Sequence, residues 1–166
     1  GFRLLSGNEI GMLLCADALD HMPLPAGARQ KLVITTIVSS TILSRMAKDK
    51  GAAYAETLTG FKWIANKAME RAAHGEHFVC GYEEALGYSV GPLVKDKDGI
   101  SAALHFAELA RELKARGQTV LDRLDEDPQP LVIESADEQP GAISVYVAGA
   151  VQSPGVYPLA AGSRWI

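Results

Sequence analysis

The first 125 residues alternate between short apolar runs and amphipathic helical patterns. The run Leu32–Val38 is rich in β-branched residues, which is typical of a buried strand. Weaker strands are predicted at Ala53–Leu58 and Phe78–Cys80. A capping box at Ser6–Glu9 predicts the start of a first helix. Ser39 and Ser40 end the strand before a second helix. This and the remaining predicted helices span Thr41–Lys50, Gly60 to about Gly75, Ile100–Leu113 and Thr119–Leu124. This alternation predicts an α/β layered domain.

The pattern changes after Asp125. Residues 127–141 contain three prolines and several acids, which is typical of a linker. Beyond them, Ile143–Val147 alternates like a strand, and a second strand is predicted at Gly155–Tyr157 after a Ser-Pro-Gly turn. The chain therefore divides into an α/β domain and a short β-rich C-terminal segment.

Composition narrows the classes of function. The net charge of −4 argues against a nucleic-acid surface, which needs clustered Lys and Arg. No apolar run is long enough to cross a bilayer, and no secretory leader is visible, so we expect a cytoplasmic protein without a membrane partner. Cys15 and Cys80 stand far apart in apolar segments and predict small buried side chains in a reducing compartment, with no metal site.

Two adjacent acids follow a short strand in the sequence Gly81–Tyr88. Ligands of open α/β sheets bind beyond the carboxyl ends of strands, so Glu83 and Glu84 are candidate acceptors for vicinal sugar hydroxyls. A carboxylate pair repels phosphate and would hold the hydroxyl edge of a sugar phosphate. Neighbouring residues of an extended segment point opposite ways, so a tight turn is needed to aim both acids at one ring. A solvated glutamate pair on a surface loop is the alternative.

Two further segments carry candidate site residues. Lys97 stands before the long helix, where it would stabilise charge or exchange a proton at the reacting oxygen, whereas a solvated loop is the alternative. Asp98 is a candidate N-cap. At the start of the third helix, Gly60, Phe61, Lys62 and Trp63 offer backbone amides and a cation to an anion, although the two aromatic residues equally suit a core or an interface.

These motifs together resemble a known family. The segments Thr35–Ser40, Glu56–Ile64, Gly81–Tyr88 and Lys97–Gly99 occur in the order found in the third domain of α-D-phosphohexomutases, especially the phosphoglucomutase and phosphopentomutase branch. The resemblance implies a mixed sheet sandwiched between helices. It also implies that residues 1–22 correspond to the end of the family's second domain, 23–126 to its third domain, 127–141 to a linker and 142–166 to a separate partial segment.

The resemblance carries functional expectations. In this family a phosphoserine and a magnesium ion, both held by other domains, transfer a phosphoryl group on a hexose phosphate. Glu83 and Glu84 would grip sugar hydroxyls, Lys97 would assist proton transfer, and Gly60–Trp63 would form the specificity loop. The residues that hold phosphoserine and magnesium are absent here, so no cofactor is expected in this chain, and by itself it should be inactive. The sequence leaves glucose, mannose and pentose substrates open.

The C-terminal segment, residues 142–166, resembles a different family. Val145–Val151, Ser153–Tyr157 and Gly162–Arg164 resemble the start of a soluble-ligand-binding β-grasp module of competence DNA receptors and polysaccharide exporters. That resemblance implies an alternative function in DNA uptake or export. A third alternative is a scaffold that self-associates through an exposed interdomain face, in place of the missing mutase domains.

Overall fold

The computed structural model describes residues 3–126, 143–147 and 155–159. The chain forms two compact units, residues 1–129 and 130–166. The elements of the first unit are α1 (Gly7–His21), β1 (Gln30–Thr36), α2 (Ile42–Asp49), β2 (Ala53–Thr57), α3 (Phe61–Ala72), β3 (Glu76–Glu83), β4 (Gly87–Val90), α4 (Gly99–Ala115) and α5 (Val120–Glu126). They agree with the predicted order of strands and helices, apart from β4.

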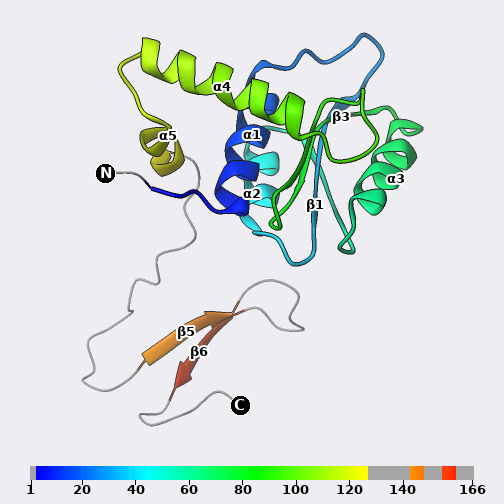
Figure 1. Ribbon diagram of the computed structural model, residues 1–166. Coiled ribbons are helices and arrows are strands. Elements are labelled where there is room, and N and C mark those ends of the chain that lie inside the picture. The colour runs from blue at the N-terminus through cyan, green and yellow to red at the C-terminus, as the bar shows by residue number, and fades with distance from the viewer. Residues whose placement is uncertain (1–2, 127–142, 148–154, 160–166) are drawn as a thin grey trace. The chain divides into compact units, whose positions relative to one another are not determined.

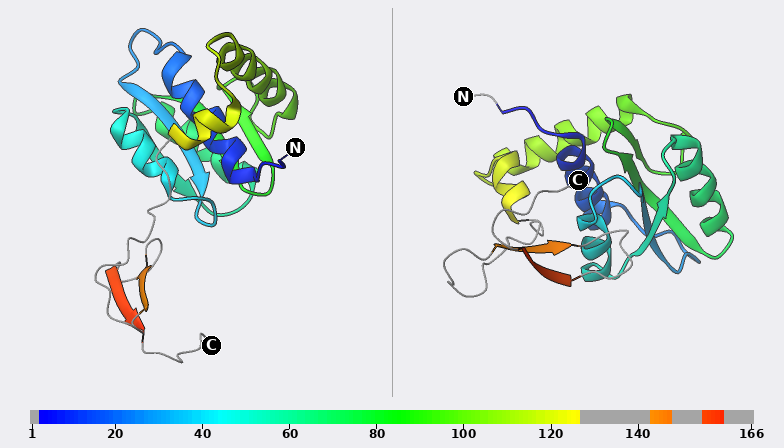
Figure 2. Two further views of the ribbon diagram at one scale, coloured as in Figure 1. Left: turned by 90° about the vertical axis from the view of Figure 1, so that its left-hand side faces the viewer. Right: turned by 90° about the horizontal axis from the view of Figure 1, so that it is seen from below.

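Four strands form a mixed sheet in the order β2-β1-β3-β4. Strand β1 pairs in parallel with both β2 and β3, whereas β4 is antiparallel to β3. Helix α3 covers one face of the sheet, and α1 and α2 lie on the other face (Figure 1, Figure 2). The predicted α/β class, a mixed sheet between helices, is therefore confirmed.

Each face of the sheet has its own core. Leu32 and Ile34 of β1 pack under α3 with Phe61 and Ile64, while Val33 packs with α1 and α2. This alternation follows from the two-residue period of a strand. Because both faces of β1 are covered, its centre, Leu32–Ile34, is continuously apolar, and this run is part of the pattern that predicted a buried strand.

Local capping chemistry fixes two helix starts as predicted. The Ser6 hydroxyl accepts from the Glu9 amide at 3.3 Å, and the Glu9 carboxylate accepts from the Ser6 amide at 2.6 Å, which completes the capping box. Asp98 caps α4 by accepting from the amides of Ile100 and Ser101 at 3.1 and 3.2 Å. Among the described helices, none combines the length and apolarity needed to cross a membrane.

Two sequence predictions at the sheet were wrong. Strand β1 ends at Thr36, because the Ser39 amide donates to the Thr36 carbonyl at 3.0 Å and turns the chain, leaving Ile37 and Val38 exposed. The sequence pattern predicted no strand after Gly87, but this segment forms β4, which pairs with β3 with Tyr88 opposite Tyr82. The chain then returns along β4, where the Asp98 amide donates to the Tyr88 carbonyl at 2.7 Å.

Helix α1 lies unusually close to β3 because it presents glycine to that strand. A Cβ at Gly7 would overlap the carbonyl oxygen of Glu84, and a Cβ at Gly11 would overlap the ring of Tyr82. Tyr82 is fully buried, and burial raises the pKa of its hydroxyl. The two glycines therefore let α1 support the end of β3 directly through backbone and ring contacts.

The second unit is described only by two strands. Strands β5 (Ile143–Val147) and β6 (Gly155–Leu159) form an antiparallel pair with Val145 opposite Tyr157. This confirms the predicted strand at residues 143–147 and extends the second one to Leu159. The predicted linker at 127–141 and the Ser153–Pro154 part of the turn lie outside the described residues.

Candidate functional site

The carboxyl ends of three parallel strands meet at one edge of the sheet. Strand β1 ends at Thr36, β2 at Thr57 and β3 at Glu83. Loops that leave parallel strands at this edge form the binding site of open α/β sheets. Glu83 and Gly60, which are 23 residues apart in sequence, therefore lie in contact.

Glu83 is tied to the loop after β2. Its side chain is buried, with 7% of the residue exposed, and its Oε1 accepts from the Gly60 amide at 2.5 Å. Gly60 has φ 119°, which favours glycine over any residue with a side chain. The sequence predicted that the Gly60 amide, directly before α3, could bind an anion from outside the protein. In the structure this amide instead donates to the carboxylate of Glu83. The interpretation of Glu83 as a solvated surface residue is wrong, because the side chain is buried.

Glu84 is tied to the loop after β1. Its Oε2 accepts from the Ser39 hydroxyl at 3.0 Å and from the Thr36 hydroxyl at 3.3 Å. Its amide donates to the same Ser39 oxygen at 3.3 Å. The turn that contains Glu84 also includes Leu86, a non-glycine residue with φ 64°. The two carboxylates are therefore held by different loops, in a tight turn between β3 and β4.

Each carboxylate keeps one oxygen without a protein donor among the described residues. For Glu83 this is Oε2, and for Glu84 it is Oε1. A carboxylate oxygen is a strong acceptor for a hydroxyl because the bond is charge-assisted. The turn thus holds two oriented acceptors whose remaining capacity suits hydroxyl groups.

Lys97 lies beside Glu83 across Gly87. A Cβ at Gly87 would lie 3.2 Å from the Glu83 Oε2 and 3.0 Å from the Lys97 Cδ, so glycine leaves room for both side chains. The Lys97 ammonium lies 5.6 Å from the centroid of the Phe61 ring and 3.5 Å from Asp96. The amide and the charge of Lys97 hold the pKa of Asp96 below its ordinary value. The structure thus brings Glu83, Lys97 and Phe61 together.

The two aromatic residues of the predicted specificity loop lie in different environments. Phe61 is buried in the core beneath α3, whereas Trp63 is 44% exposed. The Lys62 ammonium lies 5.2 Å from the centroid of the Trp63 ring. Trp63 also lines a hollow of about 280 Å³ beside the end of β2, with Leu58 and Lys67. The aromatic pair therefore divides into one core residue and one surface residue.

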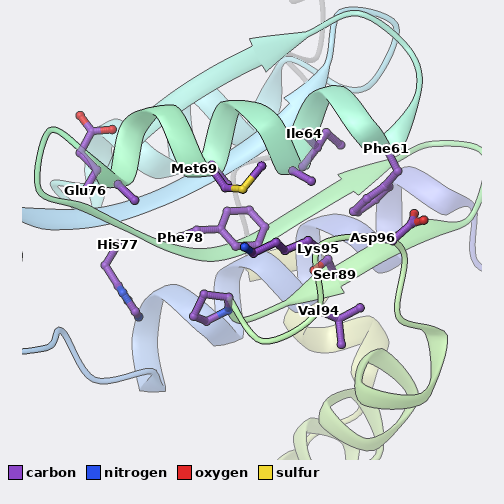
Figure 3. A pocket seen from close by; sticks show the side chains of 14 residues that line it. Phe61, Ile64, Met69, Glu76, His77, Phe78, Ser89, Val94, Lys95 and Asp96 are labelled. Carbon is purple, nitrogen blue, oxygen red and sulfur yellow. The ribbon is translucent and has the colours of Figure 1, made fainter.

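An apolar hollow of about 230 Å³ lies beside this site, between α3 and the segment after β4 (Figure 3). Ile64 and Met69 of α3 line it opposite Phe78 of β3, with Val94 and Lys95 along the other side. Its walls do not include Glu83, Glu84 or Lys97. Sugar hydroxyls need polar partners, so the carboxylate turn and not this hollow is the better candidate for a sugar site.

The sequence did not single out three residues that shape the site. Ser39 and Thr36 hold Glu84, and Gly87 makes room for Lys97. The sequence signal that could have identified Thr36 and Ser39 is their position: they lie at and just after the end of a buried strand, where ligands of open α/β sheets bind. Their partner residues lie far along the chain, which only the fold reveals.

A family comparison agrees with this architecture. Residues 6–131 match the model of the family described as phosphoglucomutase/phosphomannomutase, alpha/beta/alpha domain III. Among curated proteins, a probable phosphoribomutase of Schizosaccharomyces pombe is 37% identical over 122 residues, which cover 73% of this chain and 21% of that protein. Mouse phosphopentomutase is 36% identical over 128 residues, which cover 75% and 21%.

Two further proteins are similar to this chain. Mouse glucose 1,6-bisphosphate synthase is 33% identical over 126 residues, which cover 74% of this chain and 20% of that protein. The crystal structure of a Paramecium phosphoglucomutase, pp63/parafusin in its open form, superposes with a TM-score of 0.54 at 20% identity, covering 74% of this chain and 20% of the other. At this identity, the similarity to the Paramecium structure supports the fold of this chain and not its function. The chain spans about a fifth of the length of the curated relatives it matches.

Proposed function

Because this chain belongs to the phosphoglucomutase/phosphomannomutase family, as its alpha/beta/alpha domain III, we propose that it binds the sugar of a hexose phosphate during phosphomutase catalysis. The observation that carries the proposal is the turn at Glu83 and Glu84, where each carboxylate is anchored through one oxygen and offers the other. Lys97, beside Glu83, places a positive charge at the same edge.

The chemistry of these groups gives each a role. Glu83 and Glu84 accept hydrogen bonds from hydroxyls of the sugar ring and repel its phosphate, so they orient the hydroxyl edge toward the turn. Lys97 stabilises negative charge on the reacting oxygen or exchanges a proton with it. The Gly60–Trp63 segment, whose Gly60 amide holds Glu83, is proposed to contribute to the choice of sugar.

Phosphoryl transfer needs groups that this domain does not supply. It depends on positioning and on neutralising charge, commonly with a metal ion. Within the described residues, no group of three or more His, Cys, Asp or Glu side chains could hold a metal. We propose that this chain alone has no mutase activity.

The proposed compartment is the cytoplasm. Cys15 and Cys80 are buried and unpaired, although they lie on neighbouring elements α1 and β3. Burial and the neighbouring thiol raise the pKa of Cys15 well above its ordinary value, so this thiol is inert. Free buried thiols are typical of a reducing compartment.

Glucose 6-phosphate should shift the amide resonances of Glu83, Glu84 and Lys97 in an NMR titration of the full chain. We expect a dissociation constant on the order of millimolar, which corresponds to about 4 kcal/mol, because a few hydrogen bonds and no phosphate grip support binding. Inorganic phosphate is the control and should leave these resonances in place. Ribose 5-phosphate tests whether a pentose is also accepted.

Two outcomes would contradict the proposal. Equal shifts with inorganic phosphate would make this edge an anion site and not a hydroxyl site. Shifts confined to β5 and β6 would favour the alternative, a ligand-binding module of an uptake apparatus. The family match at residues 6–131 does not favour that alternative, and the β-grasp resemblance of the tail stays a prediction.

Large apolar side chains follow the same strand ends as the proposed site. This apolar rim consists of Ile37, Val38, Leu58, Trp63 and Leu86, which are between 44% and 64% exposed and follow the carboxyl ends of β1, β2 and β3. Exposed apolar surface that gathers in one region commonly marks an interface. We propose that other mutase domains cover the rim in a complete enzyme and that a second copy covers it in the isolated chain.

Replacing Leu58 by glutamate should reduce self-association of the isolated chain. Light scattering coupled to size-exclusion chromatography should show the wild type shifting from the 17.7 kDa monomer toward a dimer as concentration rises, and Leu58→Glu shifting less. Leu104→Glu is the matched control, because Leu104 on α4 is equally exposed at 60% but lies outside the rim. A wild type that stays monomeric at every concentration would refute the self-association proposal.

A further inference from the structure

Ser39 contacts Glu84 in two ways at once. Its hydroxyl donates to the Glu84 Oε2 at 3.0 Å and accepts from the Glu84 amide at 3.3 Å. The Thr36 hydroxyl lies 2.8 Å from the Ser39 hydroxyl and 3.3 Å from the Glu84 Oε2, and either hydroxyl can be the donor in the contact between Thr36 and Ser39. The side chain and the backbone of Glu84 are thus fixed by one oxygen atom from a loop 45 residues earlier.

The loop that carries Ser39 is itself anchored. The Ser39 amide donates to the Thr36 carbonyl at 3.0 Å, which closes a turn directly after β1. The next amide, of Ser40, donates to the Asn8 side-chain oxygen of α1 at 2.9 Å. The Ser39 hydroxyl therefore belongs to a segment that is held at both ends and is a firm support for Glu84.

Helix α1 closes the opposite side of Glu84. The Glu84 carbonyl oxygen packs against Gly7, where no Cβ fits, and the Tyr88 hydroxyl donates to the Gly7 carbonyl at 3.4 Å. Glu84 is therefore enclosed between the Ser39 loop and the start of α1. Its second carboxylate oxygen, Oε1, is the one left without a donor among the described residues.

We infer that Ser39 is a positioning residue for sugar binding, which acts through Glu84 and rests on the proposed function of that glutamate. By engaging Oε2, the Ser39 hydroxyl fixes the carboxylate in one orientation and leaves Oε1 for a ring hydroxyl. Groups held in the binding orientation lose less conformational freedom when the ligand binds, so this arrangement strengthens binding.

The test begins with the full chain without ligand. Ser39→Ala should change the ¹³C shift of the Glu84 carboxyl and speed hydrogen exchange of the Glu84 amide, whereas Ser39→Thr, which retains the hydroxyl, should restore both. Ser44→Ala is the matched control, because the Ser44 hydroxyl donates to the Thr41 carbonyl and not to Glu84. An unchanged Glu84 carboxyl resonance in a folded Ser39→Ala protein would overturn the inference.

The second arm measures glucose 6-phosphate binding. Ser39→Ala should weaken it about threefold, because the Glu84 carboxylate is retained and only its orientation is loosened. The double variant Ser39→Ala with Glu84→Gln should bind no more weakly than Glu84→Gln alone, because Ser39 acts through Glu84. If the two substitutions weakened binding independently, so that the double variant lost affinity by the product of the two single effects, the inference would be overturned. If the wild type binds no sugar phosphate, the proposed function fails, while the ligand-free measurements still decide the role of Ser39.

Discussion

Replacing Gly7 by alanine should lower the free energy of unfolding by about 3 kcal/mol or more, at the upper end of the cost of overpacking a tight contact. The new Cβ would overlap the carbonyl oxygen of Glu84, which is backbone and cannot rotate away. Helix α1 must then move from β3, which also loosens the contact between Gly11 and the Tyr82 ring. Urea denaturation followed by circular dichroism measures the loss.

Gly99→Ala is the matched control for this prediction. Gly99 is also the first residue of a helix and follows an N-cap, but a Cβ added there would meet no atom within 4 Å. Alanine there should be neutral or should stabilise the protein by up to about 1 kcal/mol, because it restricts the unfolded chain. Equal stability of the two variants would show that the close approach of α1 to Glu84 does not occur in solution.

Glu83→Ala should both destabilise the domain and abolish measurable sugar binding. It leaves the Gly60 amide without its 2.5 Å acceptor, which costs about 1–3 kcal/mol when the group stays away from water. It also removes the Oε2 acceptor beside Lys97. Urea denaturation and the glucose 6-phosphate titration measure the two effects.

Glu83→Gln separates stability from binding. The amide oxygen of glutamine can still accept from Gly60, so stability should change by less than about 1 kcal/mol, whereas the lost charge should weaken sugar binding about tenfold. Glu108→Ala is the control on a solvent-exposed glutamate, whose side chain is 56% exposed, and should change neither. Full binding by Glu83→Gln would contradict the role proposed for this carboxylate.

Hydrogen bonds that cap helices could be predicted from the sequence where donor and acceptor residues are close together along the chain. The capping box at Ser6 and Glu9 and the N-cap at Asp98 each involve residues within three positions, and both predictions were confirmed. The apolar run of β1 likewise required a strand covered on both faces. The strand and helix order followed from these signals, because each element encodes its own periodicity.

The features that could not be predicted from the sequence depend on contacts between residues far apart along the chain. The end of β1 depends on where its neighbour stops: the amide of Ile37, directly after β1, donates at 2.9 Å to the carbonyl of Thr57, the last residue of β2. Strand β4 was missed because it has only four residues, two of which are glycine and serine, and its pairing with β3 is what distinguishes it from a loop. Glu83 and Glu84 were identified as a pair, but their division between two loops required the positions of Gly60 and Ser39.

The return of the chain along β4 has a consequence for assembly. An exposed outer strand offers free backbone groups on which a foreign strand can add, and proteins commonly cover such strands. Here the segment that delivers Lys97 to the site also occupies the Tyr88 carbonyl through the Asp98 amide. A peptide that extended the sheet at β4 would have to displace this segment and the lysine with it, so we expect strand addition on this side to compete with the proposed sugar binding.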